Sequence, residues 1–146
     1  IIAQNRKARH EFHILQTWEA GMVLKGTEVK SLREGKASIT DSYARIEGGE
    51  VFLHQLHISE YKDGTHYNHH PLRKRKLLMH RSEIRKLSGS VEEKGLTLIP
   101  LKLYFRNGVA KVEIALARGK KFYDKRKDIA DRDMKRDMER SMRQRR

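Results

Sequence analysis

The chain carries two dense clusters of basic residues, and each lies next to side chains with flat rings. The first cluster is Asn5-Arg6-Lys7-Ala8-Arg9-His10, followed by Phe12, and the second is Arg73-Lys74-Arg75-Lys76, followed by His80. Lysine and arginine bind phosphate groups, and aromatic or imidazole rings stack on unpaired bases. A basic run can also be only a solvated face. In a chain of net charge +14, however, this pattern favours binding of RNA or of another single-stranded nucleic acid.

Three histidines near the middle of the chain, His66, His69 and His70, could in principle bind a metal ion. A zinc site would need a further ligand in matching geometry. Residues 59–75 have no hydrophobic period, and Asp63-Gly64 is a turn signal. We therefore interpret this segment as a polar loop and predict no metal site in it.

No other spacing in the chain indicates catalysis. Gly21 and Gly26 are spaced as in a phosphate-binding loop, but the Lys-Ser or Lys-Thr pair that should follow the second glycine is absent. Glu19 has no second carboxylate or Ser–His pair at a spacing that would support acid–base chemistry. As an isolated acid it is either solvated or an acceptor for RNA base edges and sugar hydroxyls. The sequence thus predicts no catalytic residue, no metal and no cofactor.

The composition of the chain points to a polyanion as its partner. The 146 residues correspond to about one domain, and 33 lysines and arginines outnumber 19 aspartates and glutamates. So large a positive charge suits nucleic acid or an anionic membrane surface. The absence of cysteine excludes disulfides and thiol catalysis and fits a cytoplasmic protein. No apolar run reaches the length of about 18 residues that a spanning helix needs, and no signal peptide is visible. Because the chain starts at Ile1, we expect a short N-terminal piece to precede it.

The character of the chain changes near residue 117. Residues 118–146 carry about half of the net charge of +14 in about one fifth of the length, with few large apolar residues. Asp128 could cap a helix in this tail, although arginines at every fourth position repel one another along it. The apolar positions of that helix would form one stripe, which contains Ala130, Met134, Met138 and Met142. We predict a folded body at 1–117 and a tail at 118–146 that is disordered when free and helical along an RNA wall.

Residues 1–117 have the pattern of short strands joined by tight turns. Glu47-Gly48-Gly49-Glu50 and Asn107-Gly108 are strong hairpin signals, because their residues tolerate the positive φ that a tight turn requires. Pro100 lacks an N–H and should mark a bulge or an edge. The predicted strands are 12–19, 39–46, 51–58, 75–79, 96–105 and 109–117. Helical turns capped by Thr27, Ser82 and Ser90, and closed by Gly35, Gly89 and Gly95, interrupt them. About six strands with small flanking helices predict a mainly β fold, an OB-type closed antiparallel barrel, with a sandwich as the alternative.

Alternation along two of these strands indicates which side chains face outward. By alternation, Glu19 lies on the opposite face of its predicted strand from Ile14 and Trp18. Lys111 likewise lies on the opposite face from the apolar residues of its own strand. Both charged groups are therefore expected on the outer surface of the barrel.

Several strings along the chain, taken together and in order, are specific. They are Asn5-Arg6-Lys7-Ala8-Arg9-His10, Trp18-Glu19-Ala20-Gly21, Gly26-Thr27-Glu28-Val29-Lys30-Ser31-Leu32-Arg33, Asp41-Ser42-Tyr43, Arg75-Lys76-Leu77-Leu78-Met79-His80, Pro100-Leu101-Lys102-Leu103-Tyr104-Phe105 and Arg118-Gly119-Lys120-Lys121…Asp124-Lys125-Arg126. With these strings the chain resembles, over nearly its whole length, the small protein B family. Members of this family are the SsrA-binding proteins that act with bacterial transfer-messenger RNA.

The resemblance implies an RNA-binding adaptor rather than an enzyme. The family has an OB-type barrel and a basic tail, and it binds the tRNA-like domain of transfer-messenger RNA. It helps to bring this RNA to stalled 70S ribosomes in trans-translation, with elongation factor Tu and alanyl-tRNA synthetase acting through the RNA. The body stands in for the anticodon arm that the RNA lacks. The tail is helical when bound to the ribosome, and it enters the empty message channel of the ribosomal subunit that contains the 16S rRNA.

The resemblance also implies which residues make these contacts. Glu19, Leu78 and Lys111 match RNA-contacting positions, although periodicity alone would leave Leu78 as an ordinary core leucine. The basic clusters add Lys7, Arg9, Arg73, Arg75, Lys76 and His80 as candidate RNA-binding residues. The residues expected to face the ribosome are His10, near the decoding site, and Gly119, Lys120, Lys121, Asp124, Lys125, Arg126 and, at the end of the methionine stripe, Met142.

Two other functions would fit the same composition. One is a translation module that binds ribosomal RNA without transfer-messenger RNA. The other is a small nuclease that uses histidine and glutamate side chains, although no ligand cluster in the sequence supports it.

Overall fold

Two glycine-containing turns produce the two main hairpins of the body. Strands β4 (Tyr43–Glu47) and β5 (Glu50–His54) are joined by Gly48 and Gly49, which have φ values of 58° and 78°. Strands β8 (Leu96–Arg106) and β9 (Val109–Gly119) are joined by Asn107 and Gly108, at 51° and 76°. Positive φ at both central positions gives the turn twist that matches paired strands. Both predicted hairpins are confirmed.

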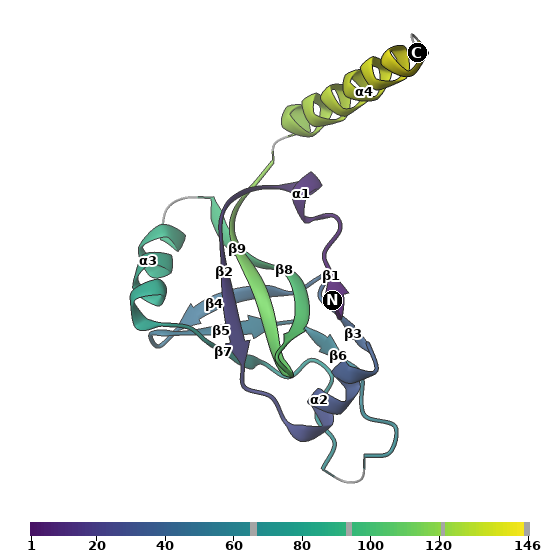
Figure 1. Cartoon of the computed structure of the whole chain (residues 1–146). Helices are drawn as coiled ribbons and strands as arrows, with labels where there is room; N and C mark the ends of the chain where they lie inside the picture. The colour runs from purple at the N-terminus through teal and green to yellow at the C-terminus, as the bar shows by residue number, and fades with distance from the viewer. Residues whose placement is uncertain (65–66, 93–94, 121, 145–146) are drawn as a thin grey trace.

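These hairpins belong to a closed ring of six antiparallel strands in the computed structural model, which describes residues 1–64, 67–92, 95–120 and 122–144 (Figure 1). The ring runs β8-β4-β5-β7-β2-β9 and returns to β8, with β2 at Phe12–Met22 and β7 at Arg75–Leu78. The short β1 (Ala3–Gln4) adds to β8, and β3 (Ala37–Ser38) pairs separately with β6 (His57–Ile58). The closed antiparallel ring confirms the mainly β, OB-type prediction over the sandwich.

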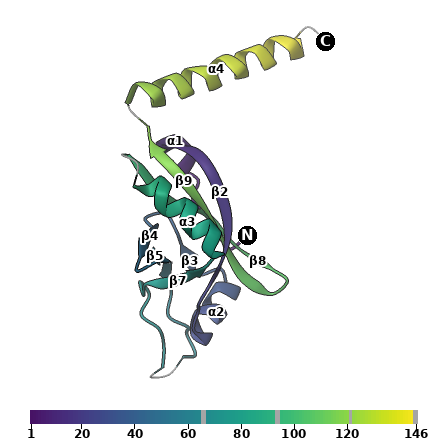
Figure 2. The same cartoon turned by 90° about the vertical axis from the view of Figure 1, so that its left-hand side faces the viewer.

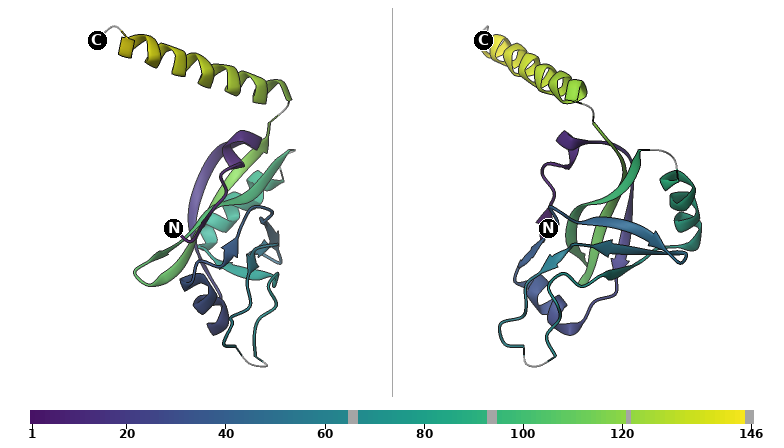
Figure 3. Two further views of the ribbon diagram at one scale, coloured as in Figure 1. Left: turned by 90° about the vertical axis from the view of Figure 1, so that its right-hand side faces the viewer. Right: turned by 180° about the vertical axis from the view of Figure 1, so that it is seen from behind.

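The interior of the ring is filled by alternate residues of its strands. Val112, Ile114 and Leu116 of β9 are buried on the inner face, as their periodicity predicts. A second, smaller cluster lies on the outer side of β8 and β9, where Ala115 and Ala117 are covered by the N-terminal segment. That segment includes the short helix α1 (Ala8–Glu11), and it lies across the ring from helix α3 (Arg81–Val91) (Figures 1 and 3).

Two β-bulges interrupt the alternation of the long strands. The bulge at Pro100 in β8 was predicted and is confirmed by a register shift between Pro100 and Lys102. The bulge in β2, between Ile14 and Gln16, was not predicted. It places Ile14 in the outer cluster and Trp18 against the main core, whereas the sequence pattern had put both on one face. A bulge adds one residue to one strand and so reverses the phase of all residues after it.

Helix α2 (Gly26–Arg33) begins one residue earlier than its predicted cap. The Glu28 carboxylate, not Thr27, accepts from the backbone N–H of the N-cap residue Lys25 at 2.7 Å. The helix ends as predicted near Gly35, which has a φ of 72°.

Helix α3 also differs from its prediction at both ends. Its N-cap is His80, not Ser82, and Glu83 accepts from the His80 backbone N–H at 3.1 Å. The helix continues through Gly89 and Ser90 to Val91, so the predicted stop and the second capping box are wrong. Leu87 is fully buried and Val91 packs against the core, and this tertiary packing outweighs the modest cost of one helical glycine.

Helix α4 (Phe122–Gln144) projects from the end of β9 near α1 (Figures 1 and 2). It begins well before Asp128, the residue expected to cap it. Its methionines Met134, Met138 and Met142 are more than 60% exposed. That the tail is disordered when free and helical along an RNA wall stays a prediction. Within the described ranges, none of the helices has the length and apolar character needed to cross a membrane.

A buried ion cluster joins α2 to β7. Glu28 and Arg75 are both fully buried, and the Arg75 Nε donates to Glu28 Oε2 at 2.5 Å. Arg73 Nη2 donates to Glu28 Oε1 at 2.6 Å. The Arg75 guanidinium also donates to the carbonyl oxygens of Leu56 and Pro71, at 2.5 and 3.2 Å. Arg75 therefore connects α2, the segment at Pro71 and the ring.

The hydrogen bonds of this cluster decide the ionisation of Glu28. Burial alone would raise its pKa, but hydrogen bonds from Arg73, the Lys25 N–H and Arg75, together with the charge of Arg75, hold the pKa below its ordinary 4.5. A carboxyl whose pKa is lower in the folded state stabilises the fold above its unfolded pKa, and this contribution is lost as the pH falls through the folded pKa.

Replacing this carboxylate should destabilise the fold strongly. Glu28→Gln leaves the buried Arg75 without its counter-charge, which should lower the free energy of unfolding by about 3–5 kcal/mol. Glu34→Gln, which breaks the exposed pair with Lys36, should change it by less than about 1 kcal/mol. Urea unfolding at neutral pH measures both effects. Below pH 4.5 the wild type should lose stability more steeply than Glu28→Gln, and equal acid sensitivity would contradict this role of Glu28.

Candidate nucleic-acid interface

Four of the predicted RNA-binding residues line one surface hollow. Glu19, Leu78, His80 and Lys111 surround a depression of about 350 Å³. Strand pairing brings three of these positions together, because Gly21 of β2 is in register with both Lys111 of β9 and Leu78 of β7. The remaining lining residues are Gly21, Met79 and Glu83. Residues that are far apart in the sequence thus form one site across three neighbouring strands.

Leu78 is on the outside of the ring. Its side chain is 53% exposed, whereas that of the preceding Leu77 is 2% exposed. Successive side chains in a strand face opposite sides, so burial of Leu77 in the core directs Leu78 to the solvent. The alternative interpretation of Leu78 as a core leucine is therefore wrong, and the hollow has an apolar contact surface.

Gly21 forms the floor between Leu78 and Lys111, and sequence reasoning did not select it as a site residue. A Cβ at this position would lie 3.4 Å from Leu78 Cβ and 3.8 Å from Lys111 Nζ. A Cβ there would make ordinary van der Waals contact with both neighbours, so the glycine leaves the floor of the hollow open. A glycine within a strand pattern often marks such a close approach, and this was the signal that could have identified it.

Lys111 differs from its basic neighbours because its charge is unpaired. The Nζ of Lys102 lies 3.9 Å from Oε2 of Glu113, and the Nζ of Lys76 lies 2.8 Å from Oε1 of Glu50. Lys111 forms no ion pair with any carboxylate in the ranges that the structure describes. Its ammonium group is therefore available to an external anion.

Glu19 is held in place by two donors from β8. The Tyr104 hydroxyl donates to Glu19 Oε2, and Arg106 Nη1 lies 2.8 Å from the same oxygen. Burial, then the hydrogen bond to Glu19 and the negative charge of Glu19, raise the pKa of Tyr104 to about 12, so this hydroxyl stays a donor at neutral pH. Because both interactions use Oε2, Oε1 can accept from an amino group or a ribose hydroxyl.

The second basic cluster is mostly used by the fold itself. Arg75 is fully buried, so its prediction as an RNA-binding residue is wrong: its guanidinium is bound to Glu28 and to two carbonyls. Arg73 keeps 27% exposure of its side chain but is also bound to Glu28. Lys76 is half-exposed, does not line this hollow, and is paired with Glu50.

The first basic cluster lies at the other end of β2. Lys7 and Arg9 are exposed beside or within α1, which directly precedes Phe12. Glu19 lies seven residue steps after Phe12 along β2, which corresponds to about 23 Å. The predicted RNA-binding residues therefore form two separate groups rather than one surface.

Three of the residues expected to face the ribosome, His10, Gly119 and Lys120, lie near this first cluster. The Lys120 N–H donates to the carbonyl oxygen of Glu11 at 2.9 Å, and Lys120 Nζ donates to that of Arg9, also at 2.9 Å. His10 and Gly119 thus lie at the same end of the body. Arg126 is exposed and Met142 is 68% exposed in α4, which also contains Asp124 and Lys125, while Lys121 lies outside the described residues.

Comparison with known proteins identifies the family of this chain. The family model described as "SmpB protein" matches residues 2–144. The chain belongs to the SmpB family. The "SsrA-binding protein" of Thermobifida fusca is 65% identical over 99% of this chain and 91% of its own length, and that of Pelotomaculum thermopropionicum is 59% identical over 99% and 95%. A solved structure described as "tmRNA-SmpB: a journey to the center of the bacterial ribosome" contains a chain with 58% identity and a TM-score of 0.68, covering 82% of this chain and 84% of that one.

The histidine-containing loop of this SmpB-family chain has a structural role. His69 is buried, and its Nε2 lies 2.9 Å from the Ile58 carbonyl oxygen, which can only accept. Nε2 therefore carries the proton, and Nδ1 accepts from the Thr27 hydroxyl at 2.9 Å. His66 lies outside the described residues. Among the residues that the structure describes, no group of three potential metal ligands occurs.

The contact between Tyr104 and Glu19 predicts a measurable titration. In Glu19→Gln the negative charge that opposes ionisation of the phenol is removed, so the pKa of Tyr104 should fall from about 12 towards its ordinary 10. NMR observation of the labelled tyrosine rings as a function of pH measures this shift. Tyr43, on another strand, is the internal control, and an unchanged Tyr104 titration would contradict the contact.

Proposed function

We propose that this chain is an adaptor that binds the tRNA-like domain of transfer-messenger RNA and delivers it to stalled ribosomes for trans-translation. The observation that carries the proposal is the meeting of Glu19, Leu78 and Lys111 around one hollow. Membership of the SmpB family, relatives named SsrA-binding proteins and the tmRNA-SmpB ribosome structure support it.

The hollow offers three complementary contacts to folded RNA. The unpaired ammonium of Lys111 binds a phosphate, and the exposed Leu78 side chain packs on a ribose or a base. Glu19, held by Tyr104 and Arg106, accepts a hydrogen bond from a ribose hydroxyl or a base amino group. Within the hollow, His80 adds a contact to the backbone of the RNA, and Lys7, Arg9 and Lys76 would add contacts outside it. The combination selects an RNA surface by shape and charge rather than by sequence.

The opposite end of the body and the tail provide the contact with the ribosome. His10, Gly119 and Lys120 lie together beside α1, about 23 Å along β2 from the hollow. We propose that this end faces the decoding site of the 16S rRNA. The basic tail, disordered when free and helical when bound, occupies the empty message channel. One short chain then connects two RNAs.

The proposed role is that of a binding protein in the cytoplasm, without a cofactor and without catalysis. Elongation factor Tu and alanyl-tRNA synthetase act on the complex through the RNA. Two rival functions give different outcomes in a purification from cells: a module for ribosomal RNA yields only ribosomal RNA, and a nuclease cleaves the bound RNA when a divalent metal is added. Recovery of intact transfer-messenger RNA supports the adaptor.

Removal of the Lys111 charge should weaken binding of transfer-messenger RNA. We expect Lys111→Ala to lower the affinity about tenfold and to reduce the log–log salt slope by about 0.7–0.9, the value for one neutralised phosphate. Lys86→Ala, an exposed lysine outside the hollow, is the matched control and should bind as the wild type does. Fluorescence anisotropy with the isolated tRNA-like domain measures both quantities. Equal affinities of the two variants would remove Lys111 from the interface.

Removal of the tail should separate RNA binding from tagging. The variant should end at Lys121, because Arg118 and Gly119 still pair with β2 and Lys120 with α1. We expect this truncation to keep the affinity for transfer-messenger RNA within about threefold and to abolish peptide tagging in a reconstituted translation assay. Full tagging by the truncated chain would contradict the proposed division of roles.

A further inference from the structure

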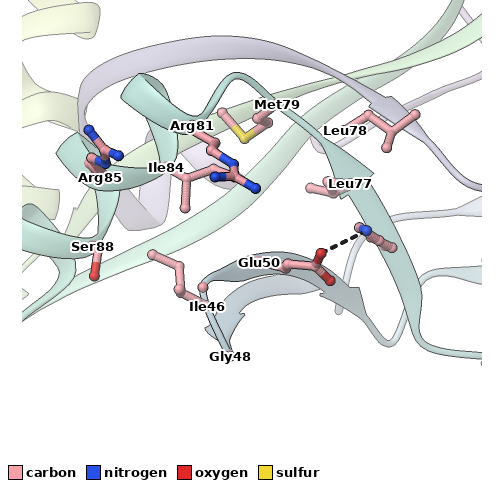
Figure 4. A pocket seen from close by; sticks show the side chains of 12 residues that line it. Ile46, Gly48, Glu50, Leu77, Leu78, Met79, Arg81, Ile84, Arg85 and Ser88 are labelled. Carbon is pink, nitrogen blue, oxygen red and sulfur yellow. Dashed lines mark ion pairs between the residues drawn. The ribbon is translucent and has the colours of Figure 1, made fainter.

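A second, larger hollow adjoins the site described above. It has a volume of about 590 Å³ and lies between the turn of the β4–β5 hairpin and helix α3 (Figure 4). Leu78 and Met79 line both hollows. The two depressions therefore adjoin each other at Leu78 and Met79, and together they are called the groove below; the candidate interface occupies only its smaller part.

The α3 side of this second hollow presents polar groups at helical spacing. Arg81, Arg85 and Ser88 lie at positions i, i+4 and i+7 of α3, and all three line the hollow. Successive turns place the two arginines about 6 Å apart along the helix axis. Figure 4 shows Arg81 reaching from α3 towards the hairpin, with Ile84 beside it and Ile46 below.

The charges of the hollow leave an excess of two cations. Lys76 and Glu50, on the strand side, neutralise each other at 2.8 Å. Arg81 and Arg85 are exposed, and neither pairs with a carboxylate of residues 1–64, 67–92, 95–120 or 122–144. These two guanidinium groups therefore resemble Lys111 in being available to an external anion, whereas Lys76 on the opposite wall is paired.

We propose that this hollow binds the sugar–phosphate backbone of the same RNA that occupies the Glu19–Leu78–Lys111 site. Arg81 and Arg85 each contact a phosphate, and Ser88 donates to a phosphate or ribose oxygen. The apolar floor of Ile46 and Ile84 packs against the sugars. The inference rests on the proposed function and extends it, because it makes α3 a second wall of the RNA-binding surface.

The charge of the two arginines can be removed while the helix is kept. The double variant Arg81→Gln, Arg85→Gln should bind the tRNA-like domain on the order of tenfold more weakly. Its log–log salt slope should be smaller by about 1.4–1.8, the value for two phosphates. Lys86→Gln is the matched control, because it removes one charge from the same helix outside the hollow, and it should bind as the wild type does.

A tethered probe separates direct contact from an indirect effect. The chain has no cysteine, so Ser88→Cys gives one attachment point for an iron chelate that generates hydroxyl radicals. In the otherwise wild-type chain, the RNA backbone should be cleaved from this position and not from Arg33→Cys on α2. This measurement does not depend on the folding of the double variant.

The outcomes distinguish the two proposals. If the wild type binds the RNA but the double variant matches Lys86→Gln, or if Ser88→Cys produces no cleavage above the α2 control, the larger part of the groove is not part of the interface. In that case the function proposed above stands. If the wild type itself does not bind transfer-messenger RNA, the proposed function fails and the groove proposal fails with it.

Discussion

The buried pairing of Arg75 with Glu28 is the interaction on which the presentation of the RNA-binding surface depends. Arg75 is the first residue of β7, and its guanidinium must point inward to reach Glu28 and the carbonyls of Leu56 and Pro71. Alternation then places Lys76 outside, Leu77 inside and Leu78 outside. A register slip of one residue would turn Arg75 to the solvent and Leu78 into the core. The buried Glu28 carboxylate would then lose its partner. The ion cluster therefore fixes the register that exposes Leu78.

The same rule of alternation assembles the rest of the site from strands that are distant in sequence. Burial of Val112 directs Lys111 outward, and burial of Ala20 directs Glu19 outward. The ring brings β9, β2 and β7 side by side, and Gly21 keeps the space between them open. No one of these strands contains the site. It exists only where the three lie next to one another.

Ion pairing separates the basic residues that support the fold from those that can meet RNA. The net charge of +14 predicts a polyanionic partner but does not say which cations bind it. Arg73 and Arg75 are held by Glu28, and Arg106 is held by Glu19, where it helps to position an acceptor. Lys111, Arg81 and Arg85 are left without acidic partners among the described residues, and they line two adjoining hollows. Pairing with acids thus removes several cations from the candidates, and the lining of the hollows selects among the cations that remain.

The sequence by itself determined the hairpins, the antiparallel fold class, the basic character and the family resemblance. These features depend on local requirements: the turns at Gly48-Gly49 and Asn107-Gly108 need positive φ, and a family is recognised by short strings. It did not determine the burial of Arg75, the bulge in β2 or the continuation of α3 through Gly89. Only the tertiary structure decided these, because each depends on partners distant in the chain: Glu28 for the arginine, β9 for the bulge and the core for the helix. Local sequence states what a residue can do, and the contacts across the ring decide which of its possible roles it takes.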